Sequence, residues 1–226
     1  AASIAEQLDS NAEDARRAAW LAKTDLITNM VSEFTNLQGI MGRYYAAADG
    51  ETTAVAVALE EQYFPKQSGA PTPSSTTGQV LALAEKIDTV CGIFSAGLIP
   101  TGDKDPYALR RASLGILRIL IENHIALDIV ELVDRALAQF NHSFNKSETH
   151  QRVIDFIFDR LKSYCLDQGF GNDEFEAVLA VSPTQPLDFM HRLQAVKNFR
   201  QLPEATSLAA ANKRISNILK KSDQAV

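Results

Sequence analysis

Apolar residues recur along nearly the whole chain at spacings of three and four positions, which is the periodicity of one face of an α-helix. Residues 79–95 follow this spacing and predict a buried helix. Residues 107–123 carry apolar side chains nearly all round and predict a helix at the centre of the fold. No segment alternates apolar and polar residues with the period of two that is typical of a strand. The pattern therefore predicts an all-α fold.

Further helices are expected wherever the same periodicity returns between polar stretches. One follows Ser10, which with Glu13 has the spacing of a capping box, and runs to about Phe34. Pro106 suits the first position of the central helix, because proline needs no backbone partner there. The other expected helices are residues 43–48, 51–63, 128–140, 148–168, 173–181, 186–199 and 204–221.

Three polar segments interrupt the helices. Residues 65–78 and 97–105 are predicted loops, the first of them rich in proline and serine. Residues 141–146 are interpreted as a linker that sets the main boundary of the chain. We therefore expect a helical domain over residues 1–146 and a smaller helical domain over residues 147–226. No internal repeat is apparent.

Charge is distributed unevenly over the 226 residues, whose formal net charge is −6. Residues 1–140 contain 11 basic and 18 acidic residues, whereas residues 141–226 contain 11 and 10. The most basic segment is residues 192–221, with one acidic residue, Glu204, against Arg192, Lys197, Arg200, Lys213, Arg214, Lys220 and Lys221. Such a segment is interpreted either as a local polyanion-binding surface or as a solvated helix face.

Signatures of catalysis or metal binding are not found in the sequence. It has no phosphate-binding glycine loop and no nucleophile elbow, and its four histidines do not form a ligand pair. Cys91 and Cys165 are expected to be partly buried, reduced thiols. No apolar run approaches 18 residues, so no membrane span is predicted. Because the chain starts with Ala1 rather than methionine, we expect an excised fragment or removal of the initiator.

The densest polar cluster is residues 102–111, Gly-Asp-Lys-Asp-Pro-Tyr-Ala-Leu-Arg-Arg. Asp103 and Asp105 precede a predicted helix, whose dipole favours negative charge at that end. Lys104, Arg110 and Arg111 can either pair with these carboxylates or contact phosphates. From the residues alone, internal pairing is favoured.

Several segments resemble the beta subunit of the two-subunit bacterial glycyl-tRNA synthetase. The resemblance is carried, in one order along the chain, by residues 22–34, 37–46, 84–89, 92–94, 99–112 and 209–219. Its strongest part is Ile-Pro-Thr-Gly-Asp-Lys-Asp-Pro-Tyr-Ala-Leu-Arg-Arg-Ala at residues 99–112. The family's full subunit is much longer, so the resemblance covers an internal to C-terminal portion.

The resemblance implies a role in tRNA recognition within a cytoplasmic synthetase. It implies an HD-type helical domain followed by the start of an anticodon-binding-type domain. It also implies an alpha-subunit partner that holds the glycine centre with ATP and Mg²⁺, so that no catalytic residue, cofactor or metal is expected in this chain. Neither DNA nor a membrane is an expected partner. The candidate residues for binding tRNA(Gly) are Lys104, Arg110, Arg111, Asn212, Lys213, Arg214, Lys220 and Lys221.

The HD-type resemblance also raises the alternative of a metal-dependent phosphohydrolase. Lys23 and Asp25 fall where such enzymes have a His-Asp pair, and Asp88 falls where they have a later aspartate. Since the imidazoles are missing, these degenerate positions make a poor transition-metal site. An ion pair between Asp25 or Asp88 and a lysine is the simpler interpretation. A scaffold that only joins subunits is the third hypothesis.

Overall fold

The computed structural model describes residues 1–67, 69–102 and 104–222, except for the side chains of residues 206, 216 and 220–222. This part of the chain contains helices and loops but no strand, which confirms the all-α prediction. The helices are α1 (Ala2–Gln7), α2 (Ala12–Leu21), η1 (Thr24–Ile27), α3 (Asn29–Glu33), η2 (Thr35–Leu37), α4 (Ile40–Ala48), α5 (Thr53–Glu61), α6 (Thr76–Ser95), α7 (Leu109–Glu122), α8 (Ile129–Leu137), α9 (Lys146–Asp167), α10 (Asn172–Leu179), α11 (Pro186–Arg200) and α12 (Ala205–Ser222).

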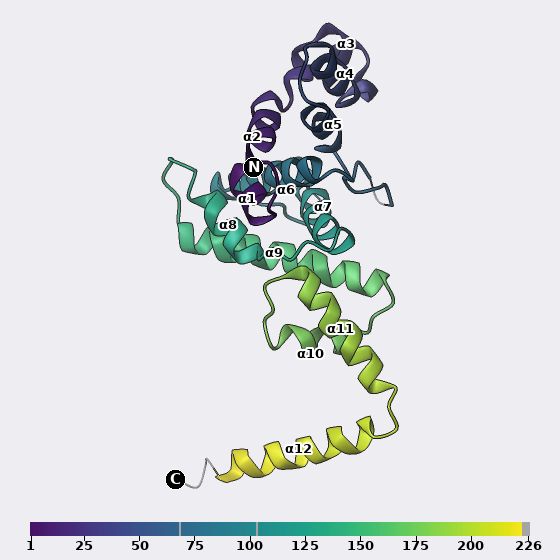
Figure 1. Ribbon diagram of the computed structural model, residues 1–226. Helices are drawn as coiled ribbons and strands as arrows, with labels where there is room; N and C mark the ends of the chain where they lie inside the picture. The colour runs from purple at the N-terminus through teal and green to yellow at the C-terminus, as the bar shows by residue number, and fades with distance from the viewer. Residues whose placement is uncertain (68, 103, 223–226) are drawn as a thin grey trace.

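Helices α6 and α7 form the centre of the molecule, as their apolar patterns predict. They pack on each other, and α5, α8 and α9 pack around them (Figure 1). Helix α9 contacts α6, α7 and α8, while α10 and α11 lie beneath it. Helix α12 contacts α11 and lies at the lower end of Figure 1, apart from the central helices.

One hydrophobic core extends across the predicted linker at residues 141–146. Its fully buried members include Leu83 on α6, Leu117 on α7, Ile157 on α9 and Phe189 on α11. The α9 side chains therefore complete a core that begins with residues before the linker. The division of the chain into two domains at residue 146 means that the two parts fold independently, and this stays a prediction.

The long first helix is not formed as predicted, because the chain turns after Leu21. Lys23 adopts a left-handed conformation with φ of 65°, which ends α2 and starts η1. The Thr28 hydroxyl then accepts a hydrogen bond from the Val31 amide at 3.3 Å and caps α3. The predicted capping box is also wrong, because Asn11, not Ser10, caps α2.

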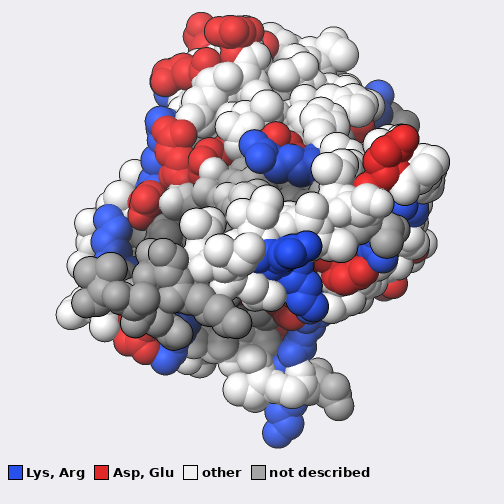
Figure 2. Space-filling model, turned by 90° about the horizontal axis from the view of Figure 1, so that it is seen from below, with Lys and Arg blue, Asp and Glu red and all other residues white. Residues whose placement is uncertain are grey.

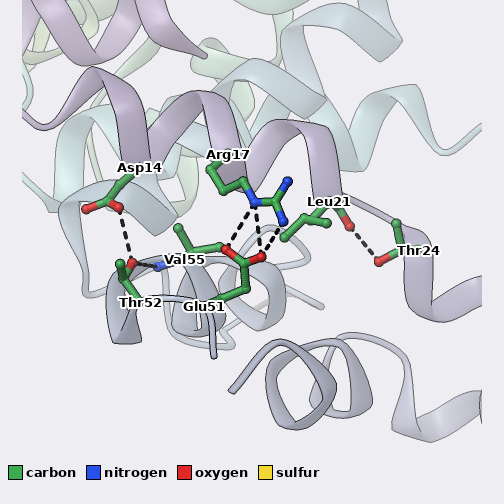
Figure 3. Close-up of polar contacts among 7 residues, drawn as sticks. All are labelled: Asp14, Arg17, Leu21, Thr24, Glu51, Thr52 and Val55. Carbon is green, nitrogen blue, oxygen red and sulfur yellow. Dashed lines mark hydrogen bonds and ion pairs between the residues drawn. The ribbon is translucent and has the colours of Figure 1, made fainter. Parts of the chain in front are cut away.

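Side-chain contacts fix α2 on the start of α5 (Figure 3). The guanidinium of Arg17 forms an ion pair with Glu51, with Nε 3.0 Å from Oε1. The Thr52 hydroxyl donates to Asp14 at 3.1 Å and accepts from the Val55 amide at 3.2 Å, so it both links the helices and caps α5. These contacts hold the end of α2, and with it the turn that carries Lys23 and Asp25.

Candidate nucleic-acid interface

The start of α7 is built around the carboxylate of Asp105. Its oxygens accept hydrogen bonds from the amides of Leu109 at 2.8 Å and Arg110 at 2.9 Å. The helix therefore begins at Leu109, after the left-handed residue Ala108, and the prediction that Pro106 opens it is wrong. Negative charge at this helix end is confirmed for Asp105, whereas Asp103 lies outside the described residues.

The three basic residues of this region are held differently. Arg110 is half-buried, and its guanidinium donates a hydrogen bond to the carbonyl of Gly102. Lys104 and Arg111 are exposed. Among the described residues, which exclude Asp103, no ion pair includes Lys104, Arg110 or Arg111. Since the carboxylate of Asp105 is used by backbone amides, Lys104 and Arg111 keep their charge at the surface.

The basic segment at residues 192–221 divides into two sets of side chains. On α11, Arg192 pairs with Asp188 at 2.6 Å, and Arg200 pairs with Asp173 at 2.7 Å. Lys197 lies 4.6 Å from the centre of the Phe170 ring and donates to the carbonyl of Gly169 at 3.0 Å. Lys197 and Arg200 therefore hold α11 to neighbouring segments, whereas Arg192 is paired within α11 itself. All three cations already have partners within the chain, which makes them weaker candidates for binding a polyanion.

The second set of cations is on α12. Asn212, Lys213 and Arg214 are exposed, and the ion pairs of the described residues include neither of the two cations. The side chains of Lys220 and Lys221 lie outside the described residues. Apolar side chains of the same helix are exposed too, namely Leu208, Ile215, Ile218 and Leu219. Helix α12 thus presents both a basic and an apolar surface.

The candidate residues do not form one surface. Helix α12 lies at the lower end of the molecule, away from the central helix α7 (Figure 1). Seen from below, blue basic groups and red acidic groups are interspersed rather than gathered into one continuous patch (Figure 2). A nucleic acid that contacts both Arg111 and Lys213 must therefore span two separate parts of the chain.

The three degenerate HD positions do not form one site, because Lys23 and Asp88 line the same cavity whereas Asp25 does not line it. Lys23 Nζ lies 2.9 Å from Glu85 Oε1, and among the described residues neither Asp25 nor Asp88 pairs with a lysine, so the expected ion pair is wrong. Asp88 is exposed on α6. No cluster of histidine, cysteine, aspartate and glutamate side chains able to hold a metal ion occurs in the described part of the chain. The name HD-like stays a prediction.

Asp25 has a structural role that the sequence did not indicate. It is buried, and its Oδ2 accepts a hydrogen bond from the Gly39 amide at 2.6 Å. Gly39 has a φ of 82°, and a Cβ there would lie 2.6 Å from the Tyr63 ring. The carboxylate therefore fixes a turn that only glycine fits.

Replacing Asp25 with alanine is expected to lower the free energy of unfolding by about 2 kcal/mol, because a buried amide loses its acceptor. Chemical denaturation followed by circular dichroism measures this change. Asp49→Ala removes an exposed carboxylate nearby and is expected to change stability by less than about 0.5 kcal/mol. Equal stability of the two variants would contradict the structural role of Asp25.

The two cysteines are free thiols, and they are fully buried rather than partly buried as predicted. Burial raises the pKa of the Cys91 thiol and of the Cys165 thiol to about 12 in each case. Both are therefore protonated near neutral pH and are poor nucleophiles. None of the helices in the described residues is long and apolar enough to cross a membrane.

Comparison with known proteins shows the family to which this helical chain belongs. Residues 1–180 match the family model described as "Glycyl-tRNA synthetase beta subunit". The chain belongs to the glycyl-tRNA synthetase beta subunit family.

Individual relatives match over the whole chain. It is 52% identical over 226 residues to the glycine–tRNA ligase beta subunit of Pseudomonas aeruginosa. It is 51% identical to the proteins of the same name from Ectopseudomonas mendocina, over 99% of the chain, and Shewanella baltica, over 100%. In each case the chain spans 33% of the relative's length.

Proposed function

We propose that the chain acts in tRNA recognition within a glycyl-tRNA synthetase. In this proposal an alpha subunit holds the centre that attaches glycine to tRNA(Gly) with ATP and Mg²⁺, in the cytoplasm. The chain itself contributes basic side chains that bind the sugar-phosphate backbone and position the tRNA. The observation that carries the proposal is that residues 1–180 match the family model.

The structure supports Lys213 and Arg214 as the first residues to test. They are exposed and adjacent on α12, whereas the cations of α11 are used in contacts within the chain. Asn212 precedes them and offers an amide that can bond to a base edge or a phosphate. Lys104 and Arg111 are a second, separate set near the start of α7.

The double substitution Lys213→Ala, Arg214→Ala is expected to weaken tRNA(Gly) binding about tenfold at physiological salt. It is also expected to reduce the salt dependence, because fewer counterions are released when two phosphate contacts are lost. Filter binding at two salt concentrations measures both effects.

The matched control is Arg152→Ala with Arg192→Ala. This double variant has the same net charge, but its two arginines pair with Glu148 and Asp188 within their own helices. The control is expected to bind tRNA as the parent does. If both double variants bind equally well while remaining folded, Lys213 and Arg214 do not contact tRNA. Co-purification of an alpha subunit with no tRNA binding by the parent would favour the scaffold hypothesis instead.

A further inference from the structure

A cavity of about 420 Å³ lies between the end of α5, the middle of α6 and the start of α7. These three helices pack in succession near the centre of the molecule (Figure 1). The charged side chains that line the cavity are Lys66, Lys86, Arg111 and Glu85. Its size is within the range of pockets that bind small molecules.

Lys86 is the buried cation of this cavity, with 6% of its surface exposed. Its Nζ donates a hydrogen bond to the carbonyl of Gln62 at 2.9 Å, whereas an ammonium group has three N–H donors. No carboxylate of the described residues forms an ion pair with it. A buried cation costs free energy unless charge or hydrogen bonds compensate, so Lys86 has unused capacity to bind an anion.

The surroundings are shaped to accommodate the Lys86 side chain. A Cβ at Gly115 on α7 would lie 2.9 Å from Lys86 Cε, so the glycine leaves the space through which the lysine passes. The neighbouring carboxylate, Glu85, lies 2.9 Å from Lys23 Nζ and is already paired. The cavity therefore has an excess of positive charge.

Tyr63 also lines this cavity. Its hydroxyl is buried without a well-formed hydrogen bond, and the side chains of Gln38 and Asp25 lie close enough to influence its pKa as hydrogen-bonding neighbours. Buried polar atoms in native proteins nearly always have a partner, which can be a bound ion or water. Lys86 thus offers donors that lack an acceptor, and Tyr63 adds a polar hydroxyl to the same cavity.

We propose that this cavity binds a phosphate monoester, with Lys86 and Tyr63 at its base and Arg111 at its mouth. A phosphate dianion supplies the acceptor oxygens and the negative charge that the lining lacks, and arginine binds phosphate through two parallel hydrogen bonds. Lys66 is exposed beside Arg111 and adds a second cation at the mouth. A free nucleotide and the 5′ end of an RNA both carry this group. The site goes beyond the function proposed above, since it is built on Lys86 and Lys66, which are not among the tRNA-binding candidates, although it shares Arg111 with them.

Calorimetric titration with adenosine 5′-monophosphate, inorganic phosphate and adenosine tests the proposal. The two phosphates are expected to bind at a single site, and adenosine is not. Arg111→Ala is expected to weaken binding about tenfold, which is the usual effect of losing a charged hydrogen bond. Arg16→Ala, which removes an exposed arginine from α2, is the matched control and is expected to bind as the parent does.

Lys86→Met is expected to abolish binding while circular dichroism shows a folded protein. Should this buried substitution prevent folding, the exposed positions Lys66 and Arg111 provide the test, each by an alanine variant. Equal binding of adenosine and its monophosphate, absence of binding by both phosphates, or unchanged binding by Arg111→Ala would each overturn the proposal.

The pH dependence identifies the contribution of Lys86. Burial lowers its pKa to about 8, while Glu85 raises it and Lys23 lowers it further. Arg111, Lys66 and Tyr63 also line the cavity. The ammonium binds an anion and is lost above its pKa, so affinity for the nucleotide is expected to fall as pH rises from about 7 to about 9. Arg111→Ala should retain this fall; a pH-independent affinity of the parent would contradict the role of Lys86.

A short RNA with and without a 5′ phosphate distinguishes the two sources of the group. Tighter binding of the phosphorylated RNA than of the mononucleotide identifies an RNA end as the ligand. Equal or weaker binding identifies a free nucleotide. The titrations with inorganic phosphate and the mononucleotide contain no RNA, so their failure is distinct from failure of the tRNA proposal, which is tested through Lys213 and Arg214.

Discussion

Replacing Phe189 with alanine is expected to lower the free energy of unfolding by about 4 kcal/mol. Phe189 on α11 is fully buried, and its ring centre lies 4.9 Å from that of Phe175 on α10 and 6.4 Å from that of Phe158 on α9. Truncation removes the ring from the junction of three helices and leaves a cavity that these helices cannot fill without moving. The loss therefore includes both the burial of the ring and its packing contacts.

Urea denaturation followed by circular dichroism measures this loss. Phe199→Ala is the matched control, because the same substitution on the same helix removes a ring that is 42% exposed. We expect the control to lose about 1 kcal/mol or less. Similar losses in the two variants would show that α11 is not packed on α9 and α10 as described.

The shape of the same transition tests the division of the chain at residue 146. The continuous core predicts one cooperative transition, shifted as a whole by Phe189→Ala. Two transitions, of which only one shifts, would support two domains that unfold separately.

Replacing Glu61 with alanine is expected to lower the free energy of unfolding by about 3 kcal/mol. The carboxylate is buried at the start of α6 and accepts hydrogen bonds from Ser74 N at 2.9 Å, Ser74 Oγ at 2.7 Å and Ser75 N at 3.1 Å. Its position at a helix N-terminus adds a favourable interaction with the helix dipole. Without it, buried donors lose their acceptors and the loop before α6 loses its anchor.

Glu60→Ala provides the control on the adjacent position of α5. Glu60 pairs at 3.0 Å with Arg43, whose side chain is half exposed, so its loss is expected to cost about 0.5 kcal/mol. Thermal and chemical denaturation of both variants measure the difference. A loss for Glu61→Ala no greater than that for Glu60→Ala would contradict the anchoring role.

The close approach of Gly78 explains why the burial of Glu61 could not be predicted from the sequence. A Cβ at Gly78 would lie 2.0 Å from Glu61 Oε2, so the first turn of α6 closes on the carboxylate. In the sequence, Glu61 is one of two adjacent acidic residues and is indistinguishable from a solvated helix face. Only the approach of α6 to the end of α5 makes one of them buried.

Among the basic residues, the sequence likewise does not reveal which cations are used internally. The same basic segment contains Arg192, Lys197, Arg200, Lys213 and Arg214. A count of charges along the sequence does not separate the cations that form contacts within the chain from those that do not. Arg192 has its partner, Asp188, one turn away on α11. The partners of Lys197 and Arg200, namely Gly169 with Phe170 and Asp173, become neighbours only through the packing of α11. This is why the segment is less basic at its surface than its composition suggests.

The sequence by itself determined that the protein is helical, where most helices lie, and which family it resembles, because apolar periodicity and local motifs are properties of neighbouring residues. Tertiary structure decided the break after Leu21, the buried carboxylates of Asp25 and Glu61, and the cavity around Lys86. Each of these depends on groups from different helices that meet only after packing. The roles of such polar residues follow from burial and from the partners they find, which local sequence does not encode.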